Sequence, residues 1–343
     1  MIKKNKIPLV SISLITYNAE RYLPFCLQSL LQQSFTDWQL LIIDNGSTDR
    51  TIPYLRENYP QFKVVTHQDN VGFAKAHNQA IDWTKSKYVF CLNQDIILDK
   101  DYLRRAVKFL EENKQVGAVT GKLYKWNFTT NEKTNILDST GLCLTKNRRV
   151  MDRGENKKDR SQYNAIEQVF GVSGAVPLYR RQALVDIKIK TKLEHEEYFD
   201  EDFFSYKEDV DLAYRLRLNG WQAFYLPIAV AWHDRSLSNS QLQKSWQIAK
   251  AHRKKNKLVN YLSYRNHLFT LYKNEFRINI LKNILPILWY EGRKWLFMQF
   301  FNNIKSRQFR SFWQLYPLMK KKRQQIKKLI KIKPQDLSKW YSK

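Results

Sequence analysis

Short polar segments follow buried-type apolar runs at three places in the first hundred residues. Thr16-Tyr17-Asn18, Asp44-Asn45 and Asn93-Gln94-Asp95 each come directly after a run rich in β-branched and apolar residues. Carboxylate and amide oxygens are the ligands that hard divalent cations such as Mg²⁺ prefer, and these cations also bind phosphate oxygens. If the fold brings the segments together, they form a plausible site for a metal and a diphosphate.

The apolar runs are predicted strands, and helical patterns separate them. We expect strands at 9–15, 38–44, 62–66 and 88–93, and helices at 18–33, from the 45–49 turn through 55, and at 72–86. This alternation predicts an α/β fold with a parallel sheet. Because ligands of such sheets bind beyond the carboxyl ends of the strands, the three polar segments should meet at one edge.

Several functional classes are poorly supported. No GxGxxG follows the first predicted strand and no GxxxxGK[ST] occurs, so neither a dinucleotide oxidoreductase nor a P-loop is indicated. A sheet that binds a nucleotide without such a loop usually anchors the diphosphate through a metal on carboxylates. Cys26, Cys91 and Cys143 form no CxxC, which argues against a disulfide framework or structural zinc and favours a reducing, cytoplasmic compartment.

Positive charge is concentrated at the C-terminal end. The 343 residues carry a net charge of +27, and a hydrophobic fraction of 43% excludes a wholly disordered chain. Residues 241–343 contain 25 Lys and Arg against 3 acidic residues, whereas residues 1–240 contain 34 against 29. The composition therefore divides the chain into a nearly neutral α/β body, 1–240, and a basic, aromatic-rich, mainly helical extension, 241–343.

The polar segments, taken in order, resemble the motifs of the family 2 glycosyltransferases of the GT-A fold, a Rossmann-like, mostly parallel sheet flanked by helices. The closest similarity is to the rhamnosyltransferase-like branch, which builds bacterial cell-surface polysaccharide. The similarity spans about residues 7 to 240. Its motifs are Thr16-Tyr17-Asn18, Asp44 to Asp49, Asn70 to Ala74, Leu92 to Asp95, Phe199 to Phe204, Glu208 to Leu212, and Trp232-His233.

The resemblance implies a Mg²⁺ or Mn²⁺ site. Asp95 matches the last carboxylate of the family's DxD motif, with Asn93 in the first position, and His233 matches a histidine that contacts the metal or the diphosphate. Asn93 lowers the negative charge of this site. The alternatives are an Asx turn after the strand and a structural histidine.

The resemblance also implies a donor site and a base. Asp44 matches the carboxylate that binds the pyrimidine base, with Thr16 and Asn18 beside the base and ribose; Gly72, Lys75 and Asn78 belong to a further donor-binding segment. Asp209 matches the general base that deprotonates the acceptor hydroxyl. Turn chemistry at Asp44 and an acidic helix start at 208–211 are the alternatives. Glu208 and Asp211 are expected to orient the site or pair with Arg215.

The implied activity is inverting transfer of a sugar from a nucleoside-diphosphate sugar to a glycan or polyprenol-linked acceptor. The leading donor is dTDP-rhamnose, and a UDP-sugar is the alternative. Two other functions remain open: a non-catalytic sugar-nucleotide binder, and a nucleic-acid-binding protein, which the ordered acidic motifs disfavour.

Aromatic and basic residues alternate at helical intervals in the extension, as in Trp289-Tyr290, Arg293-Lys294 and Leu296-Phe297. This pattern favours the surface of an anionic membrane. The alternatives are packing on the body and binding of single-stranded nucleic acid. We expect no signal peptide and no spanning helix, and hence a cytoplasmic protein peripheral to the inner face of the cell membrane.

Overall fold

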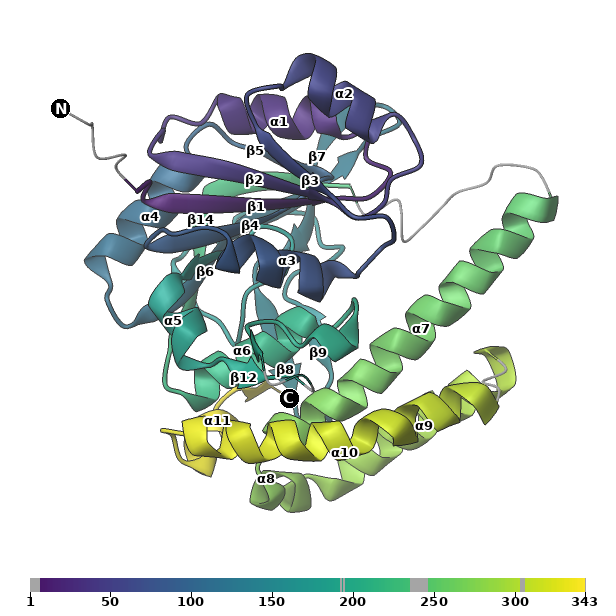
Figure 1. Cartoon of the computed structure of the whole chain (residues 1–343). Helices are drawn as coiled ribbons and strands as arrows, with labels where there is room; N and C mark the ends of the chain where they lie inside the picture. The colour runs from purple at the N-terminus through teal and green to yellow at the C-terminus, as the bar shows by residue number, and fades with distance from the viewer. Residues whose placement is uncertain (1–6, 192, 194, 235–245, 303–305, 343) are drawn as a thin grey trace.

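The computed structural model describes residues 7–191, 193, 195–234, 246–302 and 306–342, and the predicted boundary at 240/241 lies outside them. A large mixed sheet forms its centre (Figure 1), in the order β10-β14-β6-β11-β4-β1-β2-β3, with β5 on β14 and β7 on β6. The strands of this sheet are β1 (Val10–Thr16), β2 (Trp38–Asp44), β3 (Lys63–Thr66), β4 (Tyr88–Asn93), β5 (Ile96–Leu98), β6 (Val116–Asn127), β7 (Glu132–Ser139), β10 (Glu167–Gln168), β11 (Leu178–Arg180) and β14 (Gln222–His233).

Helices cover both faces of the sheet. One apolar cluster joins the sheet to α1, α2 and α4, and a second joins the opposite face to α3, α5 and α6. In Figure 1, α1 and α2 lie above the sheet and α3, α5 and α6 lie below it. These helices are α1 (Leu23–Leu31), α2 (Thr51–Asn58), α3 (Phe73–Asp82), α4 (Tyr102–Glu112), α5 (Arg181–Asp186) and α6 (Glu208–Leu218).

The α/β prediction is confirmed, and the parallel strands β1, β2, β3 and β4 lie within one residue of their expected bounds. The first and third predicted helices are longer than α1 and α3, whereas α2 continues past the predicted end at 55 to Asn58. The first begins at Leu23, because Asn18 has a positive φ of 50° that a helix cannot include. The third ends at Asp82 rather than at residue 86.

The C-terminal part is helical, as predicted, and packs against the body below α6 (Figure 1). It contains α7 (Trp246–Asn274), α8 (Arg277–Lys282), α9 (Ile284–Asn302), α10 (Ser306–Leu329) and α11 (Pro334–Ser338), and ends in β15 (Tyr341–Ser342). β15 pairs with β8 (Leu142–Thr145), which also pairs with β9 (Val150–Asp152). The remaining elements are β12 (Ile189–Lys190), β13 (Glu196–Glu197) and the 3-10 turn η1 (Glu201–Phe203).

Apolar side chains from both parts share common clusters. Ile326 and Leu337 pack with Leu142 and Tyr214, and Phe269 and Met319 pack with Phe203. Burial of large apolar side chains contributes roughly 1.5–3 kcal/mol each. Packing on the body, one of the alternatives for the extension, is therefore present, whatever else the extension binds.

Buried ion pairs also join the extension to the body. Lys322 of α10 lies 2.5 Å from Glu197 and from Asp200, and Lys273 of α7 lies 2.8 Å from Asp211 and also contacts Asp200. All of these side chains are fully buried. Buried charges are stable only when they are paired, so part of the basic charge of the extension neutralises carboxylates of the body.

No helix in the described part of the chain is both long enough and apolar enough to cross a membrane.

Candidate active site

The carboxyl ends of β1, β2 and β4 bring the three polar segments to one edge of the sheet, as the sequence predicts. Thr16 is the register partner of Asp44, and Ile15 is the partner of Asn93. All three strands are parallel, so their last residues emerge on the same side.

The Asp44 carboxylate organises the loop that follows β2. One oxygen accepts hydrogen bonds from the backbone N–H groups of Gly46 (3.1 Å) and Ser47 (2.9 Å). The other accepts from the hydroxyls of Thr16 (2.9 Å) and Ser47. A carboxylate has about four acceptor positions, so the loop itself uses them all. Asn18 ties the same loop down by accepting from the Thr48 N–H at 2.8 Å.

The segment around Gly72 packs against the loop that leads to α6. Gly72 has a φ of +90°, and a Cβ there would lie 2.6 Å from the Phe204 carbonyl oxygen, which explains the glycine. The buried amide of Asn78 donates to the Phe199 carbonyl (2.8 Å) and to Glu201 (3.0 Å), and it accepts from the Phe199 N–H (2.9 Å). Lys75 is exposed on α3. Asn78 therefore holds the 198–201 segment in place.

Asp95 and His233 lie next to each other beyond the ends of β4 and β14. His233 Nε2 is 3.4 Å from Asp95 Oδ1, and its Nδ1–H donates to the buried carboxylate of Asp138 at 2.9 Å. Burial disfavours the charged ring, but the two carboxylates outweigh it and raise the pKa of His233 to about 10. Without a metal, the ring is therefore protonated at both nitrogens, and a cation bound at Nε2 would have to displace that proton.

Asp209 lies in the first turn of α6 with its carboxylate in a cavity. One oxygen accepts from the Gly174 N–H at 3.1 Å and the other from the Val210 N–H at 2.8 Å. Burial raises the pKa of Asp209, although Lys207 opposes this. Burial and the charge of Asp209 raise the pKa of the neighbouring Glu208 to about 8. Near pH 7, Glu208 therefore favours its protonated form.

Asp211 points away from this cavity. Its carboxylate accepts from the Arg215 guanidinium at 2.9 Å and from the Asn274 amide of α7 at 2.7 Å, and it pairs with Lys273. The predicted pairing of Asp211 with Arg215 is confirmed. Its function here is to anchor α6 to α7.

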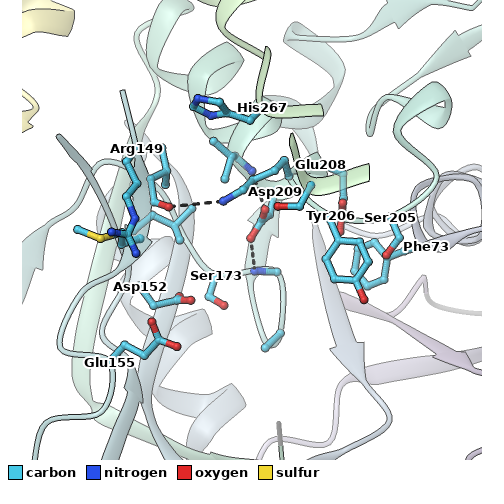
Figure 2. A pocket seen from close by; sticks show the side chains of 18 of the residues that line it. Phe73, Arg149, Asp152, Glu155, Ser173, Ser205, Tyr206, Glu208, Asp209 and His267 are labelled. Atoms are coloured by element: carbon cyan, nitrogen blue, oxygen red, sulfur yellow. Dashed lines mark hydrogen bonds between the residues drawn. The ribbon is translucent and has the colours of Figure 1, made fainter. Parts of the chain in front are cut away.

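The cavity at Asp209 has a volume of about 590 Å³ and also contains Asn93 and His233 in its walls. In Figure 2, Asp209 lies between Arg149, Asp152 and Glu155 on one side and Phe73 and Tyr206 on the other. Helices of the extension complete the wall with Ser263 and His267 of α7 and Tyr290 and Lys294 of α9.

The glycosyl transferase family 2 model matches residues 11–187, just over half of the chain. This chain belongs to glycosyltransferase family 2. The match includes Asp44 and Asp95 and ends before Glu208.

Curated relatives of this family 2 glycosyltransferase include the poly-beta-1,6-N-acetyl-D-glucosamine synthases of Staphylococcus aureus (strain COL) and Staphylococcus epidermidis. Each is 28% identical to it, over 226 and 225 residues, or 65% of this chain. The chain spans about half the length of these relatives, 49% in each case.

Solved structures share the fold of this family 2 member at low sequence identity. One is GalNAc-T7 with UDP, GalNAc and Mn²⁺, with a TM-score of 0.63 and 10% identity, covering 98% of this chain and 59% of that one. Another is S. aureus TarS 1-349 in complex with UDP, with a TM-score of 0.51 and 16% identity, covering 94% and 90%. These neighbours confirm the GT-A-like fold.

The residues beside Asp95 fit a divalent metal. The Asp138 carboxylate accepts the Nδ1–H of His233 and so directs Nε2 toward Asp95. Metal-binding histidines are commonly oriented by a carboxylate in this way. Within the described ranges, no group of three or more His, Cys, Asp or Glu side chains is placed to hold a metal ion. A metal at this family 2 site would therefore complete its coordination with diphosphate oxygens and water.

Sequence reasoning missed Asp138 and the cavity walls contributed by α7 and α9. Asp138 is 95 residues from His233 in the chain, in β7, and no motif marks it. His267 and Lys294 lie in the extension, outside every motif. The aromatic and basic alternation around Tyr290 was the only available signal, and by itself it does not indicate a cavity.

Proposed function

We propose that the protein is an inverting glycosyltransferase that transfers a sugar from a nucleoside-diphosphate sugar to a hydroxyl acceptor during synthesis of a cell-surface polysaccharide. One observation carries the proposal: the Asp209 carboxylate shares a single cavity with Asn93 and His233, and His233 contacts Asp95. A base and a diphosphate-binding edge at one cavity suit in-line displacement at an anomeric carbon.

In this mechanism Asp209 takes the proton of the acceptor hydroxyl as its oxygen attacks the anomeric carbon. The attack comes from the side opposite the diphosphate, so the configuration inverts and no covalent enzyme intermediate is needed. The amides of Gly174 and Val210 hold the carboxylate in position, and its raised pKa makes it a stronger base. Mg²⁺ or Mn²⁺ bound by Asp95 and His233 would offset the charge of the departing diphosphate.

The donor is proposed to bind at the strand-end edge. Thr16, Asn18 and Asp44 are proposed to contact a uracil or thymine base and its ribose, and Asn93 and Gly72 the diphosphate. Because the loop occupies the acceptor positions of Asp44, base recognition by this carboxylate requires the Ser47 hydroxyl to turn away. Lys75, exposed on α3, is free to reach the donor, whereas Asn78 acts through the 198–201 segment.

The sugar is proposed to be rhamnose, carried by dTDP. The curated relatives are named for synthesis of an N-acetyl-D-glucosamine polymer, which favours a donor of that sugar instead. The acceptor is proposed to be a growing glycan or a lipid-linked glycan, met by a peripheral enzyme on the inner face of the membrane.

A thermal-shift screen tests the donor. dTDP-rhamnose, UDP-N-acetylglucosamine, GDP-mannose and the free nucleotides are each added with Mn²⁺, with Mg²⁺ or with a chelator. We expect one uridine or thymidine donor to raise the melting temperature only when the metal is present. Equal shifts for all nucleotides, or none, would contradict the proposal.

A further inference from the structure

A second cavity opens beside the first, between α9 and the loop after β8. It has a volume of about 660 Å³, and α9 forms most of its wall. Arg149, Tyr290 and Lys294 line both cavities, so the second adjoins the one that contains Asp209. The residues that line it are Asn147, Arg149, Trp289, Tyr290, Arg293, Lys294 and Phe297.

The second cavity is lined by three cations and no carboxylate. Within the described ranges, no ion pair is formed by Arg149, Arg293 or Lys294, in contrast to the buried Lys273 and Lys322. Burial, together with the charges of Lys207 and Arg149, lowers the pKa of Lys294 to about 8, against the opposing charge of Glu291. Clusters of this kind bind phosphate, which offers several acceptor oxygens to Arg and Lys.

An exposed apolar surface lies next to these cations. On α8 and α9, Leu281, Leu285 and Trp289 are 69%, 77% and 69% exposed, and Leu288 and Phe297 are also exposed. Leu288 and Trp289 follow Leu285 by three and four residues within α9, so these three side chains share one side of that helix. Both helices lie on the side of the molecule remote from α1 and α2 (Figure 1).

Apolar side chains with tryptophan and flanking cations are the combination that an anionic bilayer surface accommodates. The cations alone would also suit a free phosphate, and the apolar surface alone would suit a protein partner. Because the two adjoin, an amphiphile that carries both a phosphate and a hydrocarbon chain satisfies them together.

We propose that the second cavity binds the phosphate or diphosphate of a membrane-anchored acceptor, through Arg149, Arg293 and Lys294. The hydrocarbon chain of this acceptor stays in an anionic bilayer that contacts the exposed side chains of α8 and α9. Its sugar extends past Tyr290 and Lys294, which line both cavities, to reach Asp209. That a sugar is transferred to this acceptor rests on the proposed function, whereas the binding of the amphiphile does not.

Vesicle flotation tests the proposal without any sugar transfer. The vesicles are phosphatidylcholine, phosphatidylcholine with phosphatidylglycerol, or phosphatidylcholine with farnesyl diphosphate at matched charge. Excess UDP and a chelator are included so that a donor site does not contribute. The wild-type protein is expected to bind the farnesyl diphosphate vesicles at least tenfold more tightly than the phosphatidylglycerol vesicles.

Two double variants separate the phosphate from the lipid contribution. Arg149→Gln/Arg293→Gln should lose the preference for farnesyl diphosphate, because the charge-assisted hydrogen bonds are removed. Leu285→Gln/Leu288→Gln should weaken binding to every vesicle type. The control Lys320→Gln/Lys321→Gln removes the same charge from exposed positions of α10 and should behave as wild type.

Three results would overturn the proposal: equal binding to both kinds of charged vesicle, a preference that survives Arg149→Gln/Arg293→Gln, or wild-type flotation of Leu285→Gln/Leu288→Gln. Dimethylallyl diphosphate, which is water-soluble, separates the sources of phosphate. If calorimetry shows that it binds as tightly as the vesicle lipid, the cavity takes free diphosphate and the lipid assignment is wrong. Failure of the donor screen with success here would refute the proposed transfer and leave this site standing.

Discussion

At Asp209, burial and two backbone amides act on the carboxylate in opposite directions. Burial raises its pKa, and the amides stabilise its charged form. We expect Asp209→Asn to lower kcat by about 10²–10⁴-fold, the usual contribution of a general base, with donor affinity unchanged. Turnover with nucleotide sugar and isothermal titration with the free nucleotide measure the two effects. Wild-type turnover in this variant would refute the base assignment.

The acid limb of the rate profile provides a second test of Asp209. Only the ionised carboxylate accepts a proton, and its pKa lies above the usual value of 3.8. Activity, measured as kcat/KM, should therefore fall with decreasing pH earlier than an unshifted aspartate allows. An acid limb at or below pH 3.8 would contradict this.

Glu208→Gln is the matched variant for Asp209→Asn. Since the pKa of Glu208 is about 8, against 4.5 when unfolded, the native state binds more protons between these pH values and the free energy of unfolding falls as pH rises. The glutamine keeps the neutral form. We expect this variant to retain most activity at pH 7 and to show a flatter dependence of stability on pH in urea titrations. Loss of activity equal to that of Asp209→Asn would show that Glu208 itself is required.

Asp138 orients His233 at the edge of the sheet. Asp138→Asn should reduce Mn²⁺ affinity by roughly 10–100-fold, the usual effect of removing the partner of a metal-binding histidine. Paramagnetic titration of free Mn²⁺ in the presence of UDP measures this directly. Unchanged affinity would mean that the ring needs no carboxylate to hold it.

On the scale of elements, α7 and α10 hold the acidic segment 197–202 and the start of α6 in place. Lys322 contacts Glu197, Asp200 and also Asp202, at 2.5, 2.5 and 2.6 Å. Lys322→Met should lower the free energy of unfolding by about 3–5 kcal/mol, because it leaves buried carboxylates unpaired. Lys321→Met, at the exposed neighbouring position, should change it by no more than about 0.5 kcal/mol. Equal effects of the two in urea unfolding would contradict the network.

The sign of the pH effect follows from Asp200. Burial opposes its charge, but Lys273 and Lys322 outweigh burial and hold the pKa of Asp200 below its usual value of 3.8. The contribution of Asp200 is therefore complete above pH 3.8 and is lost as the pH falls further.

On the scale of the whole molecule, the extension and the body share apolar clusters and ion pairs. A fragment of residues 1–240 would expose Phe203 and leave Asp200 and Asp211 without Lys273 and Lys322. We expect this fragment to aggregate or to unfold without cooperativity, as judged by near-UV circular dichroism and urea titration beside the full chain. A monomeric fragment with a cooperative transition would show that the body folds alone and that the two parts are separate domains.

The sequence alone predicted the four parallel strands, the edge at which Thr16, Asp44 and Asn93 meet, and the placement of Asp95 after a strand and of Asp209 at the start of a helix. These features follow from local periodicity and from the direction of parallel strands, both of which are written in short stretches of chain. Only the tertiary structure revealed the contact of Asp138 with His233, the role of Asp211 as an anchor for α7, and the cavity walls from α9. Each of these depends on side chains that are distant along the chain, and the order in which helices pack decides such contacts. For the same reason, the composition of the basic extension favoured only a membrane-binding surface. In the structure its Lys273 and Lys322 also pair with carboxylates of the body, and its helices form part of the cavity wall.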